Sequence, residues 1–328
     1  MSNAALNISV TGIQAAQKMA SAIGQNIANA NTQGYRRVDV ITSEMNFSGP
    51  NNIPFLPAGV MATAVTPDKP WLDSRLNMAV NQNTQAQSYL NSLQDFSSSI
   101  NLEAIEKRFS EFMGVSQDAM LIPTSQTLER FRASLDGLII DINQFTNLVE
   151  NSIKRLNQQR ELIQKELQSE TNILNINDLQ GKLTGINKAL NTINNTSDNV
   201  NNIIANAVND INDAYGIEII KNDNGKYISD FNPNGDFQSL TEYGSQQFNT
   251  DIGTEKSMLG IAIRDAISSK EFANTELQGA SEAWDNAYGV DITSEFLKLK
   301  QVESYHQANV MAAKVASDMT GTLLNILV

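Results

Sequence analysis

Apolar and small residues recur every seven positions near the start of the chain. One stripe of this repeat mixes large and small residues, and it consists of Leu6, Ile13, Ala20 and Ile27. A second stripe interleaves with it and consists of Ser9, Ala16, Ile23 and Ala30. The spacing predicts an amphipathic helix of about 25 residues. Because small residues fill half of these positions, the pattern favours close approach to a partner helix over a core of its own.

The last part of the chain, residues 292–327, carries a matching pattern. Its seam residues alternate three and four positions apart, and they are Val302, Tyr305, Asn309, Ala312, Ala316, Met319, Leu323 and Ile326. We expect the two ends of the chain to pair as the two halves of one coiled coil. Asn309 is the polar member of this seam, and a buried polar seam residue fixes helix register while lowering stability.

Larger apolar residues occupy the middle of the chain. In two long stretches they again alternate three and four positions apart, and the segment NILNINDLQGKL between the stretches contains the turn-forming Asn177 and Gly181. We therefore expect a reversal near these two residues and two antiparallel helices, around 128–168 and 183–214. Residues 90–112 have the same spacing and are expected to form a third member of the bundle.

Asparagine is frequent from residue 172 to residue 212. It is a mediocre helix former, yet the apolar spacing here is helical. We interpret these asparagines as polar filling of a solvated helix face, with a compositional bias of the genome as a second explanation, and assign them no function.

Two stretches predict extended structure. Residues 216–231 surround an Asn224-Gly225 pair, which tolerates the positive φ angles of a tight turn and predicts a β-hairpin. Residues 46–70 contain five prolines and cannot be helical. We expect an extended connector there, with one short edge strand at AGVMATAVTP.

Together these patterns predict a mainly α protein. We expect residues 1–45 and 285–328 to form a discontinuous domain of terminal helices paired as a coiled coil. Residues 46–284 are expected to form an elongated antiparallel helical bundle, with a small β-hairpin and loop insertion at about 216–250. The chain length of 328 residues suits two domains.

Composition narrows the range of partners. The formal charge of −13 argues against nucleic acid, whose phosphates require a basic surface. No stretch approaches the roughly 20 continuous apolar residues of a membrane-spanning helix, so we expect no membrane partner. The absence of cysteine excludes disulfides, thiolate catalysis and cysteine-based metal sites. The N-terminus also lacks the basic and apolar regions of a cleavable secretory signal.

Candidate catalytic chemistry is sparse. His306 is the only histidine, so a metal site with a pair of histidines cannot form within one chain. A serine–histidine–aspartate network would depend on this one residue. The carboxylates of residues 103–111 alternate with basic residues in the manner of a charged helix face. We therefore expect no catalytic residues, no metal, no cofactor and no enzyme activity.

Specific motifs at both ends of the chain resemble one protein family. The segment NISVTGIQAAQKMASAIGQNIANANTQGYRR resembles the N-terminal signature of the bacterial flagellar axial proteins, which build the rod, the hook and the hook-associated segments. The matching residues are Gly12, Ala15, Asn26, Ile27, Ala28, Asn29, Asn31, Thr32, Gly34, Tyr35 and Arg36. The segment GVDITSEFLKLKQVESYHQAN resembles the ending of the same family. Its matching residues are Gly289, Val290, Glu295, Gln301, Tyr305, Ala308 and Asn309.

The interior decides which branch of that family the chain resembles. Rod and hook subunits place largely β domains between their terminal helices, whereas residues 90–212 of this chain predict long helices. In this respect the chain is similar to the hook-associated protein 1 family, whose members form the junction between hook and filament. That family usually carries one or two sizeable outer β domains, and here only about 216–250 is left for them.

The resemblance implies a structural role and a set of partners. The partners are copies of the chain in a tubular assembly, hook subunits, adjacent hook-associated and filament proteins, a flagellar export chaperone and the export apparatus. The implied location is extracellular, at the hook–filament junction, reached without a cleavable signal peptide. A hook or distal-rod subunit is the alternative within the family. A helical signalling or receptor module and a soluble enzyme are the alternatives outside it.

The N-terminal motif also has a physical reading. Its asparagine and threonine side chains can bond their own backbone and end a helix, while Gly34 permits a turn that a Cβ would hinder. We expect the motif to stop the first helix and redirect the chain, with Tyr35 packed over the corner.

Overall fold

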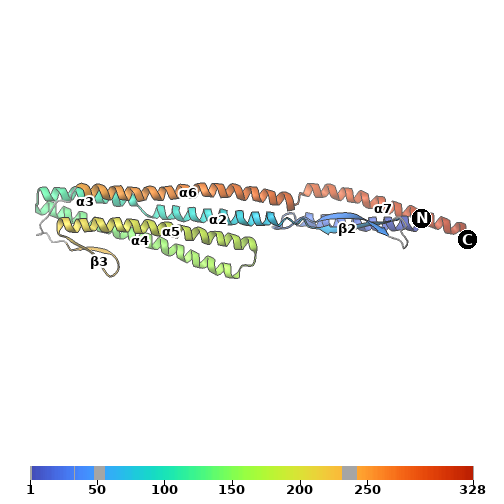
Figure 1. Ribbon diagram of the computed structural model, residues 1–328, viewed down its shortest axis with the longest axis horizontal. Helices are drawn as coiled ribbons and strands as arrows, with labels where there is room; N and C mark the ends of the chain where they lie inside the picture. Colours follow the sequence, from blue (N-terminus) through green and yellow to red (C-terminus); the bar gives the residue numbers. More distant parts are fainter. Residues whose placement is uncertain (1, 33, 48–55, 231–241, 328) are drawn as a thin grey trace. The chain divides into compact units, whose positions relative to one another are not determined.

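A computed structural model describes residues 2–32, 34–47, 56–230 and 242–327. The chain divides into two compact units, one made of Met1–Leu76 with Gly279–Val328 and the other of Asn77–Gln278 (Figure 1). The prediction of a mainly α fold, with a helical bundle and a small β-hairpin, is confirmed. Among the described residues, no helix combines the length and the apolar content that crossing a membrane requires.

The first unit joins the two ends of the chain through a helix pair and a β-ribbon. Its main elements are α1 (Ser2–Ala28), β1 (Asp39–Phe47), β2 (Leu56–Val65) and α7 (Ile292–Leu327). Helices α1 and α7 pack against each other, as their heptad stripes predicted. The two strands pair antiparallel, with Asp39 opposite Val65, and both lie against α1.

One of the two predicted stripes of α7 faces α1. The second stripe that faces α1 lies one position later in the sequence than predicted. In the first stripe Val302 and Ala316 are buried, and half-buried Asn309 sits where a Cβ on Gly12 of α1 would collide with it. The second stripe consists of half-buried Leu299, His306, Ala313 and Thr320. The predicted positions, which are Tyr305, Ala312 and Met319, are instead exposed. Apolar residues lie on more than one side of α7, so spacing alone could not say which side meets α1.

The β-ribbon replaces the connector that the sequence analysis expected in this region. The strand expected at AGVMATAVTP is confirmed as β2, but its antiparallel pairing with a second strand, β1 at residues 39–47, was not predicted. Pro57 lies beyond the register irregularity between Met45 and Asn46, where a missing N–H disturbs the ladder least. Strand β2 and residues 66–76 belong to the same unit as the terminal helices, whereas the sequence-based division had placed them with the bundle.

Within the described residues, the second unit consists of five helices and a hairpin. Its elements are α2 (Pro70–Ser99), α3 (Leu102–Leu121), α4 (Ser125–Ser169), α5 (Ile173–Tyr215), β3 (Glu218–Lys221), β4 (Tyr227–Asp230) and α6 (Glu242–Tyr288). Residues 70–76 of α2 and 279–288 of α6 belong to the first unit. Helices α4 and α5 pack together as predicted, and their large apolar residues form one core with those of α2, α3 and α6.

Three boundaries in this unit differ from the sequence-based expectation. The chain reverses at residues 170–172, where Asn172 caps α5, and Asn177 and Gly181 lie inside that helix. Residues 90–112 are divided between α2 and α3, because α2 ends at Ser99 and Asn101 caps α3. Residues 242–250 belong to α6 rather than to the insertion. Residues 231–241 of the predicted insertion lie outside the described part of the chain.

Asparagine side chains attach the β3–β4 hairpin to the bundle. The amide of Asn212 on α5 bonds both the N–H and the C=O of Ile219, at 2.9 and 3.1 Å. The amide of Asn143 on α4 does the same for Tyr227, at 2.9 Å for both bonds. Each amide thereby replaces a neighbouring strand at one edge of the hairpin. The interpretation of the asparagines as solvated filling was wrong for Asn212.

Glycine allows α5 to approach α2 at unusually close range. A Cβ on Gly181 would lie 2.5 Å from the backbone oxygen of Asn81, and one on Gly185 would collide with that of Gln85. These neighbours are backbone atoms and cannot rotate away. Asn81 and Thr84 also bond α5 directly, through Asn177 O at 3.0 Å and the Asp178 carboxylate at 2.7 Å.

We expect Gly185→Ala to lower the free energy of unfolding by roughly 1–3 kcal/mol, because the new methyl group forces the two helices apart. The matched control is Gly260→Ala on α6, where a Cβ meets nothing within 4 Å. That change should raise stability by about 0.5–1 kcal/mol, because alanine is the better helix former. Urea unfolding followed by circular dichroism measures both. Equal effects of the two substitutions would contradict the close approach.

Candidate functional site

The corner after α1 is held by the side-chain amide of Asn26, which is 1% exposed. Its Nδ2 donates to Val38 O at 2.9 Å and to a carboxylate oxygen of Glu295 at 3.0 Å. Its Oδ1 accepts from Val38 N and from the Tyr35 hydroxyl, both at 2.8 Å. A primary amide has two N–H donors and two acceptor positions, so every one of them is used. The residue links α1, the start of the ribbon and α7.

The other motif residues end the helix locally. Asn29 Nδ2 donates to Gln25 O at 2.9 Å, and the Thr32 hydroxyl donates to Asn29 Oδ1 at 3.3 Å. Gly34 has a φ of 77°, which reverses the chain and is accessible to glycine at little strain. Asn31 is exposed at the turn. The geometry is that of the expected corner, with Tyr35 reaching back across it.

Arg36 attaches the corner to the residues that precede α7. Its guanidinium pairs with Asp73 at 2.7 Å and lies 4.7 Å from the centre of the Tyr288 ring. Trp284 donates to the same carboxylate at 3.0 Å. The Tyr288 hydroxyl accepts from the backbone N–H of Lys69 at 2.8 Å. Asp73, Trp284 and Tyr288 were not among the predicted site residues, although the two aromatic residues lie just before the GVDITSEF segment and were a usable signal.

Glu295 is a buried carboxylate, 1% exposed, that has two partners. Besides the Asn26 amide, it accepts from Lys298 Nζ at 2.6 Å. A buried charge needs such compensation, so this pair and the amide belong to one network. Burial raises the pKa of the Tyr35 hydroxyl above its ordinary value, and the negative charge of Glu295 raises it further.

The predicted seam residues fall into three groups. Val302 and Ala316 are buried, and Leu6, Ile13, Ala20, Ile27 and Asn309 are half-buried. Tyr305, Ala312 and Met319 are exposed. Leu323 and Ile326 lie in α7, but their side chains lie outside the described part of the chain.

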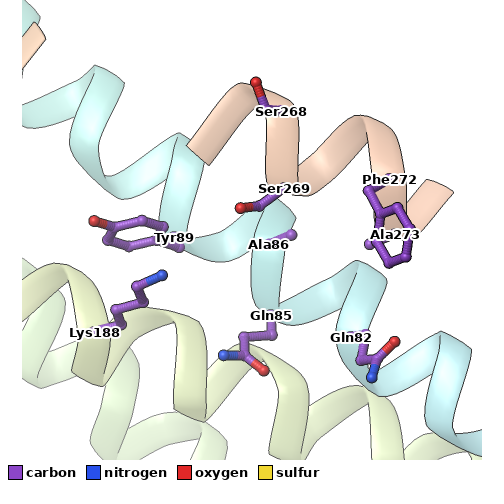
Figure 2. A pocket seen from close by; sticks show the side chains of 9 residues that line it. All are labelled: Gln82, Gln85, Ala86, Tyr89, Lys188, Ser268, Ser269, Phe272 and Ala273. Carbon is purple, nitrogen blue, oxygen red and sulfur yellow. The ribbon is translucent and has the colours of Figure 1, made fainter. Parts of the chain in front are cut away.

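The second unit has an open groove between α2, α5 and α6, with a volume of about 470 Å³. Figure 2 shows the residues that line it, which are Gln82, Gln85, Ala86, Tyr89, Lys188, Ser268, Ser269, Phe272 and Ala273. Lys188 Nζ lies 4.3 Å from the centre of the Tyr89 ring, over its face. The lining is formed by amides, hydroxyls, two aromatic rings and one ammonium group, and no carboxylate is among these residues.

The described residues contain no group of three histidine, aspartate or glutamate side chains arranged to hold a metal ion. His306 lies half-buried on α7, in the stripe that faces α1. The corner around Asn26 is a polar network that joins residues distant in the sequence, and its bonds hold α1, the start of β1 and α7 together.

Comparisons with protein-family models, with curated proteins and with solved structures found no match for this chain.

We expect Asn26→Ala to lower the free energy of unfolding by about 2–4 kcal/mol, because it leaves the Tyr35 hydroxyl, the Glu295 carboxylate and the Val38 backbone groups without their partner. Asn29→Ala is the control, since that amide bonds only within the helix end. It should lower stability by less than about 1 kcal/mol. Urea unfolding of both variants makes the comparison, and similar losses would contradict the special role of Asn26.

The raised pKa of Tyr35 predicts a pH dependence. Because the folded state favours the protonated hydroxyl, the stabilisation is complete below the ordinary pKa of 10.0 and is lost as pH rises through the raised pKa. The difference in unfolding free energy between the wild type and Tyr35→Phe should therefore stay constant up to about pH 9 and shrink as the pH rises past the ordinary pKa of 10.0. A difference that does not shrink above pH 10.0 would contradict the assignment.

Proposed function

We propose that this chain is a structural subunit of the bacterial flagellum that joins the hook to the filament. In this proposal it assembles with copies of itself through its paired terminal helices. The observation that carries the proposal is the uncovered apolar side of α7. The signature motifs at the two ends of the chain support the flagellar setting.

The uncovered side of α7 has the spacing of a second helix-packing seam. Tyr305, Val315 and Met319 are 65%, 59% and 58% exposed, and the small residues Ala308 and Ala312 lie between them in a three-four alternation. Helix α1 covers only the other seam. A helix that is apolar on more than one side is normally buried on more than one side, so further helices should cover this seam in the working assembly.

The corner around Asn26 gives this seam a fixed orientation within the first unit. Asn26 joins α1 to α7 through Glu295, and Asn309 fits against Gly12 further along the same pair. These polar contacts oppose sliding of one helix along the other. Copies of the chain would therefore present the same surface to one another, which a regular tube requires.

The interior of the chain favours the junction over the related positions. The hook and distal-rod subunits, whose terminal motifs the chain also resembles, carry largely β domains between their terminal helices. The described part of Asn77–Gln278 is instead a helical bundle with one short hairpin. The implied partners are hook subunits on one side and hook-associated or filament proteins on the other. Delivery would use the flagellar export apparatus and a chaperone.

The test uses purified protein and hooks isolated from cells that lack their own junction protein, which bypasses export. We expect the wild type to bind the hook ends and Val315→Lys to bind at least about tenfold more weakly, because a charge enters the apolar seam. Gln307→Lys, on the exposed polar side of α7, should bind within about twofold of the wild type. Electron microscopy counts occupied hook ends.

Unfolding curves of the two lysine variants provide the folding control, and they should match that of the wild type. If Val315→Lys binds hooks as well as Gln307→Lys does, the uncovered seam is not the assembly surface. If the wild type does not bind hooks at all, the junction function is wrong.

A further inference from the structure

Helix side chains bond some of the outward backbone groups on the strand edges of the described residues. Asn143 and Asn212 cover the two edges of the β3–β4 hairpin, at Tyr227 and Ile219. In the ribbon, α1 covers the outer edge of β2. There Val60 N donates to the Thr11 hydroxyl at 3.1 Å, and Lys18 Nζ donates to Ala62 O at 3.0 Å. Uncovered edges recruit other strands, so such coverage prevents unwanted pairing.

In the described residues, the outer edge of β1 has the longest run of outward positions without a bond. In an antiparallel pair, residues directly opposite each other point their backbone groups the same way, either toward each other or outward. Val60 and Ala62 point outward, and their partners in the register are Glu44 and Thr42. Asn26 bonds both backbone groups of Val38, which confirms that even-numbered residues of this segment face outward.

Three consecutive outward positions follow Val38 on this edge, at Val40, Thr42 and Glu44. Within the described part of the chain, β1 has a strand on one side only, and no side chain bonds the outward N–H or C=O of these three residues. Asn26 thus bonds the backbone of Val38 as a neighbouring strand would. The next outward backbone groups, those of Val40, Thr42 and Glu44, have no such partner among the described residues.

A groove runs beside the start of this open edge. It has a volume of about 340 Å³, and its lining residues are Met19, Ala22, Ile23, Val38, Asp39, Val40, Glu295, Lys298, Gln301 and Val302. Helix α1 supplies an apolar floor, β1 forms one wall and α7 forms the other. Neighbouring strands lie about 4.8 Å apart, so a strand paired with β1 would lie over this floor.

We propose that the open edge of β1 is a binding site for an extended segment of another protein, which adds to the ribbon as a third strand. Its backbone would pair with Val40, Thr42 and Glu44, and its inward side chains would rest on Ile23 and Val302. Main-chain bonds give such strand addition its affinity, and alternate side-chain sites give it specificity. This inference does not depend on the proposed flagellar function.

The surroundings define the chemistry of that segment. Lys298 of α7 reaches the Asp39 carboxylate of β1 at 3.9 Å, so α7 lies within two side-chain lengths of the start of this edge, and β1 of a second copy would bring its own β2 into that space. The occupant is therefore a lone extended segment of a different protein. Apolar inward side chains suit the floor. The exposed carboxylate of Glu44 at the far end of the edge favours a basic residue over an acidic one.

The probe is a synthetic seven-residue peptide of alternating valine and threonine with a lysine at each end, titrated into the full chain. We expect Thr42→Pro to weaken its binding at least about tenfold, because proline removes an outward N–H. Thr42→Val keeps that N–H and should bind within about twofold of the wild type. The same peptide with alternate backbone nitrogens methylated should not bind, because it cannot donate to the edge.

Hydrogen exchange of the wild type supplies a readout that does not depend on folding of the proline variant. Bound peptide should slow exchange at the amides of Val40, Thr42 and Glu44, and leave the amide of Ser43 unchanged because it already faces β2. The proposal is overturned if the peptide fails to bind, or if the methylated peptide binds equally well. Self-association of the chain that Thr42→Pro abolishes would also overturn it, since the occupant would then be a second copy.

Discussion

The four hydrogen bonds of the Asn26 amide are the constraint on which the terminal unit depends. They satisfy the Tyr35 hydroxyl, both backbone groups of Val38 and one oxygen of the buried Glu295. Aspartate would lack the two donors, and an apolar residue would lack all four groups, so the site selects asparagine by its bonding capacity. With the corner fixed, β1 starts in a defined register, and the ribbon can lie along α1.

The same constraint connects the fold to the proposed function. Glu295 lies on the α7 seam that faces α1, so the amide that ends the first helix also positions the last one. Helix α7 consequently keeps its second apolar seam, around Tyr305 and Val315, uncovered within the chain. We propose that copies of the chain bury this seam when they assemble. Because the seam would be buried only between copies, it would add to the stability of the folded chain only at protein concentrations at which the copies associate.

Much of the helical architecture followed from periodicity, because large apolar residues such as Phe131 and Ile193 become buried only on one helix face. Periodicity could not choose between the two apolar sides of α7, so Tyr305 and Met319 were assigned to the wrong seam. The sequence predicted β2 but not its pairing with β1 or its bonds to Thr11 and Lys18, which lie far away in the sequence. The motif predicted the corner, but the burial of Glu295 and the ring of Tyr288 depend on tertiary contacts.

Electron cryomicroscopy of isolated hooks, with and without the purified chain, would show whether copies assemble through α7. We expect an added layer at the distal hook end, in which neighbouring copies of the α1–α7 pair contact each other through the side of α7 that carries Tyr305, Val315 and Met319. Hook ends that look the same with and without the chain would contradict the account. So would a bound layer in which that side of α7 faces solvent.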